Sequence, residues 1–307
     1  MAYRLQSGEA VPAGLRRIAC EELSAASSLL QHATARTRDD AIHEARKSVK
    51  KVRAILRLMK GELGQIYEVE NGRLRDLARR LSVYRDATVM IETLDQLHEH
   101  YKSDPSSRSL ASIRLGLVAN RQRLQRGSRM TSAMRRASDA LLAAAARASR
   151  WRLLIDGPVA LAPGMKTAYS RGRKAMASVR RHTQAEYCHE WRKRVKDHWY
   201  HLRLLEGRWH AAARSREKSL KELEKWLGEH HNLEVLATRL AEQAGRRGMP
   251  KQAKLCRGLI RELQGELRLK ALALGDRLYR EKPEQFWERM APLWRPRGTG
   301  GSGRGPA

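Results

Sequence analysis

Histidine and a group of basic residues recur at one spacing in two places of the chain. HEARKSVK occupies His43–Lys50, and HEWRKRVK occupies His189–Lys196, 146 residues later. Lysine and arginine bind phosphate and other oxyanions through charge-assisted hydrogen bonds, and a histidine beside them is a further donor that titrates near neutral pH. The sequence therefore predicts recognition of an anion by two copies of one motif.

The basic residues of each motif gather on one side of a helix. At about 100° per residue, five side chains of the first motif region fall within an arc of about 100°, away from the apolar positions: His43, Arg46, Lys47, Lys50 and Arg57. The second region repeats the arrangement with His189, Arg192, Lys193, Lys196 and Arg203. Exposed helices usually intersperse acidic residues for i,i+4 pairs, yet no Asp or Glu occurs between Arg46 and Lys60. We therefore expect an external anion to compensate this charge.

Apolar periodicity indicates that helices must position these residues. Ile42, Val49 and Leu56 belong to a stripe with steps of three and four residues, on a helix that Asp39 or Asp40 could cap and Gly61 could end. The same spacing runs through most of the chain, and the runs typical of strands are missing. The predicted fold class is all-α, with helices near residues 11–36, 39–60, 68–101, 166–181, 186–206, 211–246, 251–280 and 284–291, and one or two more within 106–150.

The repeat predicts an internal duplication. Its register holds from Leu56 and Leu202 to Val89 and Val235, and glycines and prolines interrupt the helical pattern near residues 156–164. We expect two pseudo-symmetric antiparallel four-helix bundles, one over residues 1–155 and one over residues 156–295. Residues 296–307 lack an apolar anchor and are predicted to form a flexible tail.

The net charge of the chain predicts a polyanion as its binding partner. The 307 residues include 62 Lys and Arg against 33 Asp and Glu, a formal net charge of +29. Such a field attracts nucleic acid, an anionic membrane surface or a phosphate polymer. Three widely spaced cysteines give no disulfide framework or zinc motif, and neither a signal peptide nor a run of about 18 apolar residues is present. We expect a cytoplasmic protein without membrane insertion, and its oligomeric state stays open.

A second shared segment adds polar residues to both halves. RDLARRLSVYRDATV at Arg75–Val89 matches KELEKWLGEHHNLEV at Lys221–Val235. The match pairs Arg79 with Lys225, Arg85 with His231, and Asp86 with Asn232. We expect Asp86 to orient a nearby arginine through a bidentate salt bridge, whereas Asn232 offers a hydrogen bond without charge.

Both segments together resemble the conserved histidine α-helical domain (CHAD) family over nearly all of residues 11–291. The resemblance implies two four-helix bundles with a basic surface between them. It also implies binding of inorganic polyphosphate, with association with polyphosphate granules, and neither catalysis nor a cofactor. The implied polyphosphate-binding set is His43, Arg46, Lys47, Lys50, Arg53, Arg57, Arg79, Arg85, His189, Arg192, Lys193, Lys196, Arg203, Lys225 and His231, with Asp86 and Asn232 as supporting residues.

The second half departs from this pattern at three positions. Trp199 stands where the first half has Arg53, and Asp197 stands where it has Lys51, so the second basic stripe carries less charge. Asn232 stands where the family usually has Asp, which predicts a weaker support of the second stripe.

Composition agrees with a phosphate polymer as ligand. A phosphate chain offers about one negative charge per unit and no bases, so its binding surface needs Lys and Arg donors but no stacking aromatics. Aromatic residues make up only 5% of the chain. The alternative is sequence-independent nucleic-acid binding, which also uses basic contacts and counterion release, although no RNP-like aromatic motif, zinc finger or GxxG loop is present.

Metal binding and catalysis are less favoured by the sequence. His198, His201, His230 and His231 lie near one another in pairs, but cations surround them and no HExxH arrangement occurs. Phosphohistidine chemistry at His43 or His189 would need a nucleotide site, and the chain has no P-loop. The ExExK carboxylates of a triphosphate-cleaving tunnel are missing as well. No metal and no catalytic residue is therefore predicted.

Overall fold

The computed structural model describes residues 3–6, 8–103, 110–126, 128–206, 211–244 and 251–294, without the side chains of 211–213, 243–244 and 251–252. Most of these residues lie in helices and the rest in turns and loops, which confirms the all-α prediction. The predicted tail, 296–307, lies outside the described residues. The helices are α1 (Val11–Gln31), α2 (Arg38–Leu58), α3 (Lys60–Leu63), α4 (Gln65–His100), α5 (Leu110–Gln125), α6 (Ser128–Ala148), α7 (Gly157–Arg181), α8 (Ala185–Leu204), α9 (Ala211–Ala244), α10 (Lys251–Leu278) and α11 (Pro283–Met290), followed by the 3-10 turn η3 (Ala291–Leu293).

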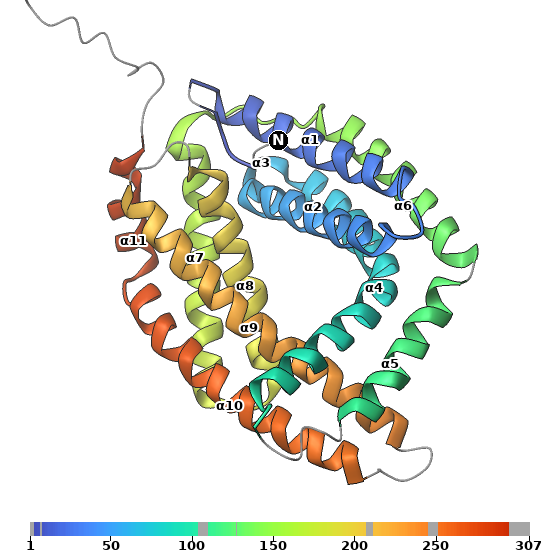
Figure 1. Ribbon diagram of the computed structural model, residues 1–307. Helices are drawn as coiled ribbons and strands as arrows, with labels where there is room; N and C mark the ends of the chain where they lie inside the picture. Colours follow the sequence, from blue (N-terminus) through green and yellow to red (C-terminus); the bar gives the residue numbers. More distant parts are fainter. Residues whose placement is uncertain are drawn as a thin grey trace, which may run out of the picture.

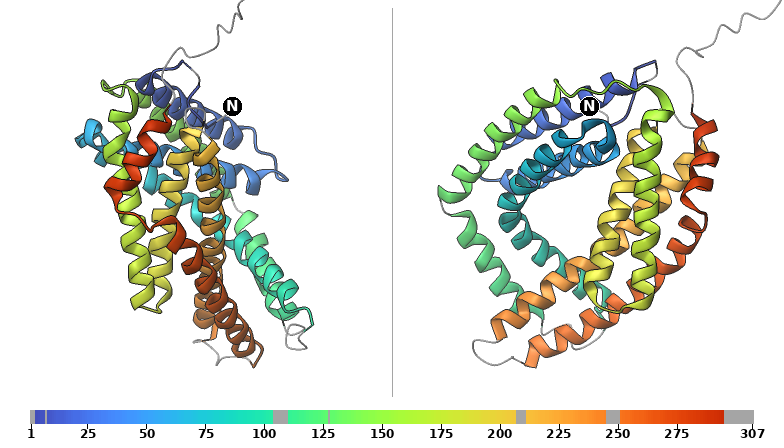
Figure 2. Two further views of the ribbon diagram at one scale, coloured as in Figure 1. Left: turned by 90° about the vertical axis from the view of Figure 1, so that its left-hand side faces the viewer. Right: turned by 180° about the vertical axis from the view of Figure 1, so that it is seen from behind.

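The helices form two groups that meet along corresponding members. In the first half α1, α2, α4 and α6 contact one another in a ring, and in the second half α7, α8, α9 and α10 do the same. Between the halves, α2 packs on α8 and α4 packs on α9. In Figure 1, α7 and α8 lie on the left, and α9 and α10 run from there along the bottom, while the views of Figure 2 show α4 running down to cross α9. The internal duplication and its residue boundaries stay predictions from the sequence.

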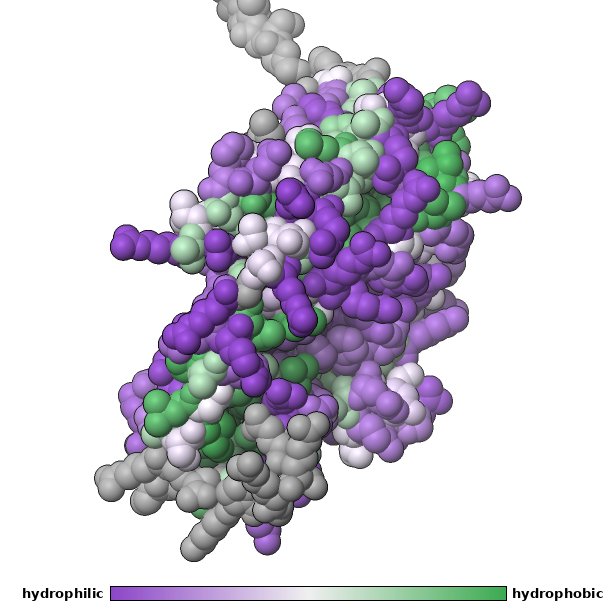
Figure 3. Space-filling view, turned by 90° about the vertical axis from the view of Figure 1, so that its right-hand side faces the viewer, coloured by the Kyte–Doolittle hydropathy of each residue, from purple (hydrophilic) through white to green (hydrophobic). Residues whose placement is uncertain are grey.

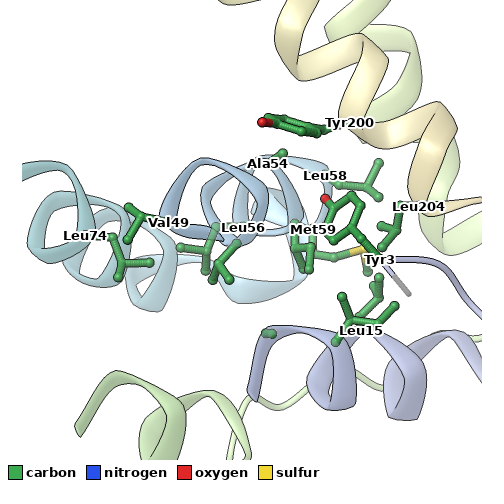
Figure 4. Close-up of a cluster of buried hydrophobic side chains, with 14 of the residues drawn as sticks. Tyr3, Leu15, Val49, Ala54, Leu56, Leu58, Met59, Leu74, Tyr200 and Leu204 are labelled. Atoms are coloured by element: carbon green, nitrogen blue, oxygen red, sulfur yellow. The ribbon is translucent and has the colours of Figure 1, made fainter. Parts of the chain in front are cut away.

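One apolar core extends through both groups. The stripe predicted for the first motif helix is buried throughout, with Ile42, Val49 and Leu56 fully covered in α2, and Val195 and Leu202 are buried in α8. Figure 4 shows α2 lying between α1 and α8, with Leu15 on one side and Tyr200 on the other. A smaller cluster joins the far ends of α4 and α9 to α5 and α10. The motif helices are thus held by burial of their apolar faces.

The ends of α2 differ from the prediction. Thr37 precedes the helix, and Asp39 and Asp40 lie inside its first turn, where acidic side chains favour the positive end of the helix dipole. The Asp39 carboxylate accepts hydrogen bonds from Thr88 and Gln125, at 3.1 and 2.9 Å, so it joins α2 to α4 and α5. Gly61 does not end the helix. The chain turns instead at Gly64, whose φ of 50° suits glycine.

The expected interruption near residues 156–164 is wrong, because α7 begins at Gly157 and continues through it. Asp156 Oδ1 accepts hydrogen bonds from the first amides of both α7 and α1, each at 2.8 Å, and so caps the two helices together. Pro158 lies in the first turn, where no amide donor is needed. Gly164 serves close packing, since a Cβ there would lie 2.1 Å from the Leu58 carbonyl oxygen of α2.

Polar contacts join the halves beside this crossing. Arg57 of α2 pairs with Asp197 of α8 at 2.6 Å, and His201 Nε2 lies 2.8 Å from the Ala54 carbonyl oxygen. The segment before α1 crosses to the second half as well, where the Leu5 amide donates to the Leu204 carbonyl at 2.9 Å. No described helix is both long and apolar enough to cross a membrane.

Candidate anion-binding site

A cavity of about 290 Å³ lies where α2 and α4 face α8 and α9. The structure brings ten of the predicted residues to its wall, which are His43, Arg46, Lys47, Lys50, Arg85, Asp86, Arg192, Lys196, His231 and Asn232. Both copies of the motif therefore contribute to one site. The packing of α2 on α8 explains this convergence, because the two apolar faces are buried and the basic faces border the gap between the helices.

The basic side chains of the cavity lower one another's pKa values. Burial, and then the charges of Lys196, Arg192 and Arg46, together lower the pKa of Lys50 to about 7. Burial also lowers the pKa of Lys196, although Glu224 opposes the shift. Positive charge here is costly until an anion compensates it.

Glu224 is a wall residue that the sequence did not reveal. Its Oε1 lies 2.6 Å from Lys196 Nζ and 3.3 Å from an Arg192 Nη atom, so one carboxylate serves two cations. The matching position of the first half is Ala78, where Arg46 donates to the backbone carbonyl. The signal in the sequence is the KELEK segment, where Glu224 has no acidic counterpart in the first half.

The two halves use the histidine position differently. The rings of His189 and His231 stack with centroids 3.9 Å apart. Burial, and then the charges of His189 and Arg192, lower the pKa of His231 to about 3. His43 is more exposed, and its pKa is lowered by burial and by the charge of Arg85, the residue that matches His231. Near neutral pH these rings are neutral, and a bound anion would raise their pKa values.

Lys47 and Lys193 have acidic partners inside their own motifs. Lys47 Nζ lies 3.0 Å from a Glu44 oxygen, and Lys193 pairs with Glu190 at the same i,i+3 spacing. The glutamate of each HE pair thus holds the lysine of the same motif. Lys193 is exposed and does not line the cavity.

The remaining members of the predicted set lie outside the cavity wall. Arg53 donates to Asn71 at 2.9 Å, and burial with the charge of Arg57 lowers its pKa to about 10. Arg57 is taken up by the ion pair with Asp197. The guanidinium of Arg203 lies over the rings of Tyr3 and Trp199. His189 stacks on His231 but does not line the cavity, while Arg79 and Lys225 are exposed on α4 and α9.

The salt bridge expected at Asp86 forms elsewhere. Arg85 makes its bidentate pair with Glu92, at 2.8 and 2.9 Å. Among the described residues Asp86 has no ion pair. It accepts a hydrogen bond from Ser82, and burial raises its pKa against the opposing charge of Arg46. Asn232 occupies the matching place on the cavity wall.

Aromatic side chains complete the wall on α8. Trp199 and Tyr200 line the cavity, and Lys196 Nζ lies 5.9 and 5.7 Å from their ring centroids. The Trp199 indole donates to Glu217 at 2.5 Å. Trp199 is thus fixed by a partner where the first half has Arg53. In the part of the chain that the structure describes, no three His, Cys, Asp or Glu side chains converge to hold a metal ion.

The family model described as the CHAD domain matches residues 23–241. The chain belongs to the CHAD domain family. Its fold is similar to a solved structure described as the CHAD domain from the plant Ricinus communis, with a TM-score of 0.61 and 17% identity over 91% of this chain and 93% of that one. A chain described as PptA from Streptomyces chartreusis aligns with a TM-score of 0.48 and 17% identity, over 89% of this CHAD chain and 99% of its own length. No curated protein matches.

Proposed function

We propose that this CHAD domain is a non-catalytic module that binds inorganic polyphosphate in the cavity between its halves. The observation that carries the proposal is the convergence of both basic stripes on one cavity, with Arg46, Lys50, Arg192 and Lys196 on facing helices. A polyanion lying between the helices would neutralise both stripes at once. Family membership supports the same ligand.

Unmet bonding capacity in the site also supports an anionic ligand. Arg192 lines the cavity, and its Nε is buried without a hydrogen-bond partner among the described residues. A buried donor without a partner costs about 1 to 3 kcal/mol, which a phosphate oxygen would recover. Lys50, with its lowered pKa, would regain its full charge beside the same anion.

The size of the cavity favours a narrow chain over a duplex. A volume of about 290 Å³ corresponds to about ten water molecules at about 30 Å³ each. A phosphate chain can enter such a space, whereas duplex DNA can only meet its rim. Sequence-independent binding of nucleic acid is therefore the second candidate, supported by the overall charge of +29.

We assign the module to binding because Glu224, the wall carboxylate with ion pairs, is taken up by the cations Lys196 and Arg192. Asp86 is half-buried near Arg46 and accepts a hydrogen bond from Ser82. In this proposal the protein is cytoplasmic and associates with polyphosphate granules through the same cavity.

Calorimetric titration with long-chain polyphosphate at about 0.15 M salt tests the proposal, with orthophosphate and duplex DNA as competitors. We expect saturable binding that DNA does not displace. The variant Lys47→Gln with Arg192→Gln should lose about 100-fold in affinity, because each charge-assisted hydrogen bond contributes about 1.5 kcal/mol. Lys102→Gln with Lys282→Gln removes the same charge from exposed positions outside the cavity, and should lose less than about twofold.

Two results would contradict this function. Equal losses in both double variants would mean that attraction is diffuse and that the cavity is not the site. DNA binding that is as tight as polyphosphate binding, with the same sensitivity to Lys47→Gln and Arg192→Gln, would favour the nucleic-acid alternative.

A further inference from the structure

A second, larger hollow lies on a different face of α4. A groove of about 860 Å³ separates α4 from α6 and shares no lining residue with the basic cavity. Leu74 and Leu77 of α4 and Ala137 and Ala144 of α6 are buried along its floor. Figure 3 shows the side of the molecule that α5 and α6 face, where hydrophilic residues dominate and apolar residues appear in patches between them.

Arginines border this apolar floor. Five arginines line the groove against a single acidic side chain, Asp76, and they are Arg73, Arg80, Arg129, Arg136 and Arg147. Arg73 and Arg147 share Glu70, at 2.8 Å each. Arg80, Arg129 and Arg136 form no ion pair with any residue that the structure describes. The groove therefore combines an apolar floor with an uncompensated positive rim.

The second half shows what covers the same face of the matching helix. Arg80 and Tyr84 of α4 correspond to Trp226 and His230 of α9 in the 146-residue register. There α10 packs along α9, His230 is buried, and Gln264 of α10 donates to the His230 carbonyl at 3.2 Å. In the first half the chain breaks into α5 and α6, and α6 packs mainly on α1. At His230, α10 thus covers the α9 position that matches Tyr84, whereas Tyr84 lines the groove on α4.

We propose that the groove between α4 and α6 is a docking site for an acidic amphipathic helix of a partner protein. In the second half a helix, α10, packs at the position that matches Tyr84, and the groove is long and straight enough along α4 for a helix. Its apolar stripe would lie over the exposed lining residues Ala140 and Ala143, and glutamates or aspartates on its flanks would pair with the free arginines. Residues 295–307 of this chain contain no acidic residue, so that segment does not supply the occupant.

The length of the groove sets the length of the helix. From Arg73 to Tyr84 the groove follows α4 for about 17 Å at 1.5 Å per residue. A partner helix of about 12 residues spans that distance, and longer helices would continue beyond it. The site is independent of polyphosphate binding, because the two cavities lie on different faces of α4.

A labelled 20-residue peptide tests the site by fluorescence anisotropy. The probe carries leucine or alanine at every third or fourth position and glutamate on both flanks, and a scrambled peptide of the same composition is its control. We expect saturable binding of the probe only. Arg80→Glu with Arg136→Glu should weaken it at least about tenfold, and so should Ala140→Trp, which fills the groove from an exposed position.

Matched controls distinguish this site from the basic cavity. Lys102→Glu with Lys282→Glu changes the net charge equally and should leave probe affinity within about twofold. The groove variants should keep wild-type polyphosphate affinity and melting temperature. The proposal is wrong if the scrambled peptide binds equally, or if Lys47→Gln with Arg192→Gln abolishes probe binding. Displacement of the probe by phosphatidylglycerol vesicles would assign the groove to a membrane surface and overturn it as well.

Discussion

Replacing Lys50 by arginine should remove the main pH dependence of polyphosphate binding. The pKa of Lys50 is lowered to about 7 in the free protein, and a bound phosphate would return it toward 10.5. Above pH 7 the protein must therefore take up a proton when it binds, and its affinity falls as the pH rises. From pH 7.5 to 8.5 the expected loss is about eightfold, and about 0.9 proton is taken up per site at pH 8.

Arginine keeps its charge throughout this range. The Lys50→Arg variant should thus bind with nearly equal affinity at pH 7.5 and 8.5, while Lys50→Met should bind weakly at both. Calorimetric titrations in two buffers with different ionisation enthalpies measure affinity and proton uptake together. The histidines of the cavity are present in all three proteins, so the comparison isolates Lys50. If Lys50→Arg shows the same pH dependence and the same proton uptake as the wild type, then protonation of Lys50 does not cause the pH dependence of binding.

Three further predictions concern the interface and the cavity. Burial lowers the pKa of His201 to about 4 in the folded protein, below its value of about 6.5 in the unfolded chain. The contribution of the neutral ring to the free energy of unfolding is therefore full above pH 6.5 and is lost as the pH falls toward 4. In denaturant unfolding at pH 4.5, His201→Gln should avoid about 2.5 kcal/mol of the stability that the wild type loses. Gly164→Ala should cost about 1 to 3 kcal/mol, since its Cβ would meet the Leu58 carbonyl at 2.1 Å. Glu224→Gln should raise polyphosphate affinity about tenfold at low salt, because the carboxylate competes with the ligand.

Each of these has its own control. From pH 8 to pH 4.5 the free energy of unfolding should fall less in His201→Gln than in the wild type, and parallel losses would contradict the assignment to His201. Gly258→Ala, at an α10 position with no atom within 4 Å of the added Cβ, should be neutral or slightly stabilising. A Glu224→Gln protein that binds polyphosphate more weakly would show that the carboxylate supports the site.

Helical periodicity was sufficient to find most of the cavity wall, because spacing along a helix fixes which side chains share a face. It could not show which basic side chains of the two facing helices remain exposed once the helices pack together. Arg57 was predicted as a ligand, but its guanidinium lies in the contact between the halves, where Asp197 holds it. In the sequence, Asp197 indicates only a loss of positive charge relative to Lys51. The partners of a residue depend on how two helices cross, and periodicity within one helix carries no such information.

The start of α7 shows a limit of another kind. Proline and glycine at 157–164 are common in loops, yet Pro158 is compatible with a first helical turn and Gly164 is required by a close helix crossing. A loop and the first turns of a helix can have the same local composition, and only the packing of α2 against Gly164 shows that this segment is helical. Glu224 was missed because its counterpart Ala78 contributes a backbone carbonyl, which no sequence comparison displays.

The contact between Leu5 and Leu204 affects the order in which the chain can fold. These residues are separated by 199 positions, and the amide of the first donates to the carbonyl of the second. A ribosome adds about 5 to 20 residues per second, so the segment around Leu5 emerges about 10 to 40 seconds before its partner is made. During synthesis α1 and α2 can pair early, but the segment around Leu5 cannot contact α8 until α8 has been synthesised. The contact between this segment and α8 can therefore form only late in synthesis, after α8 has been made.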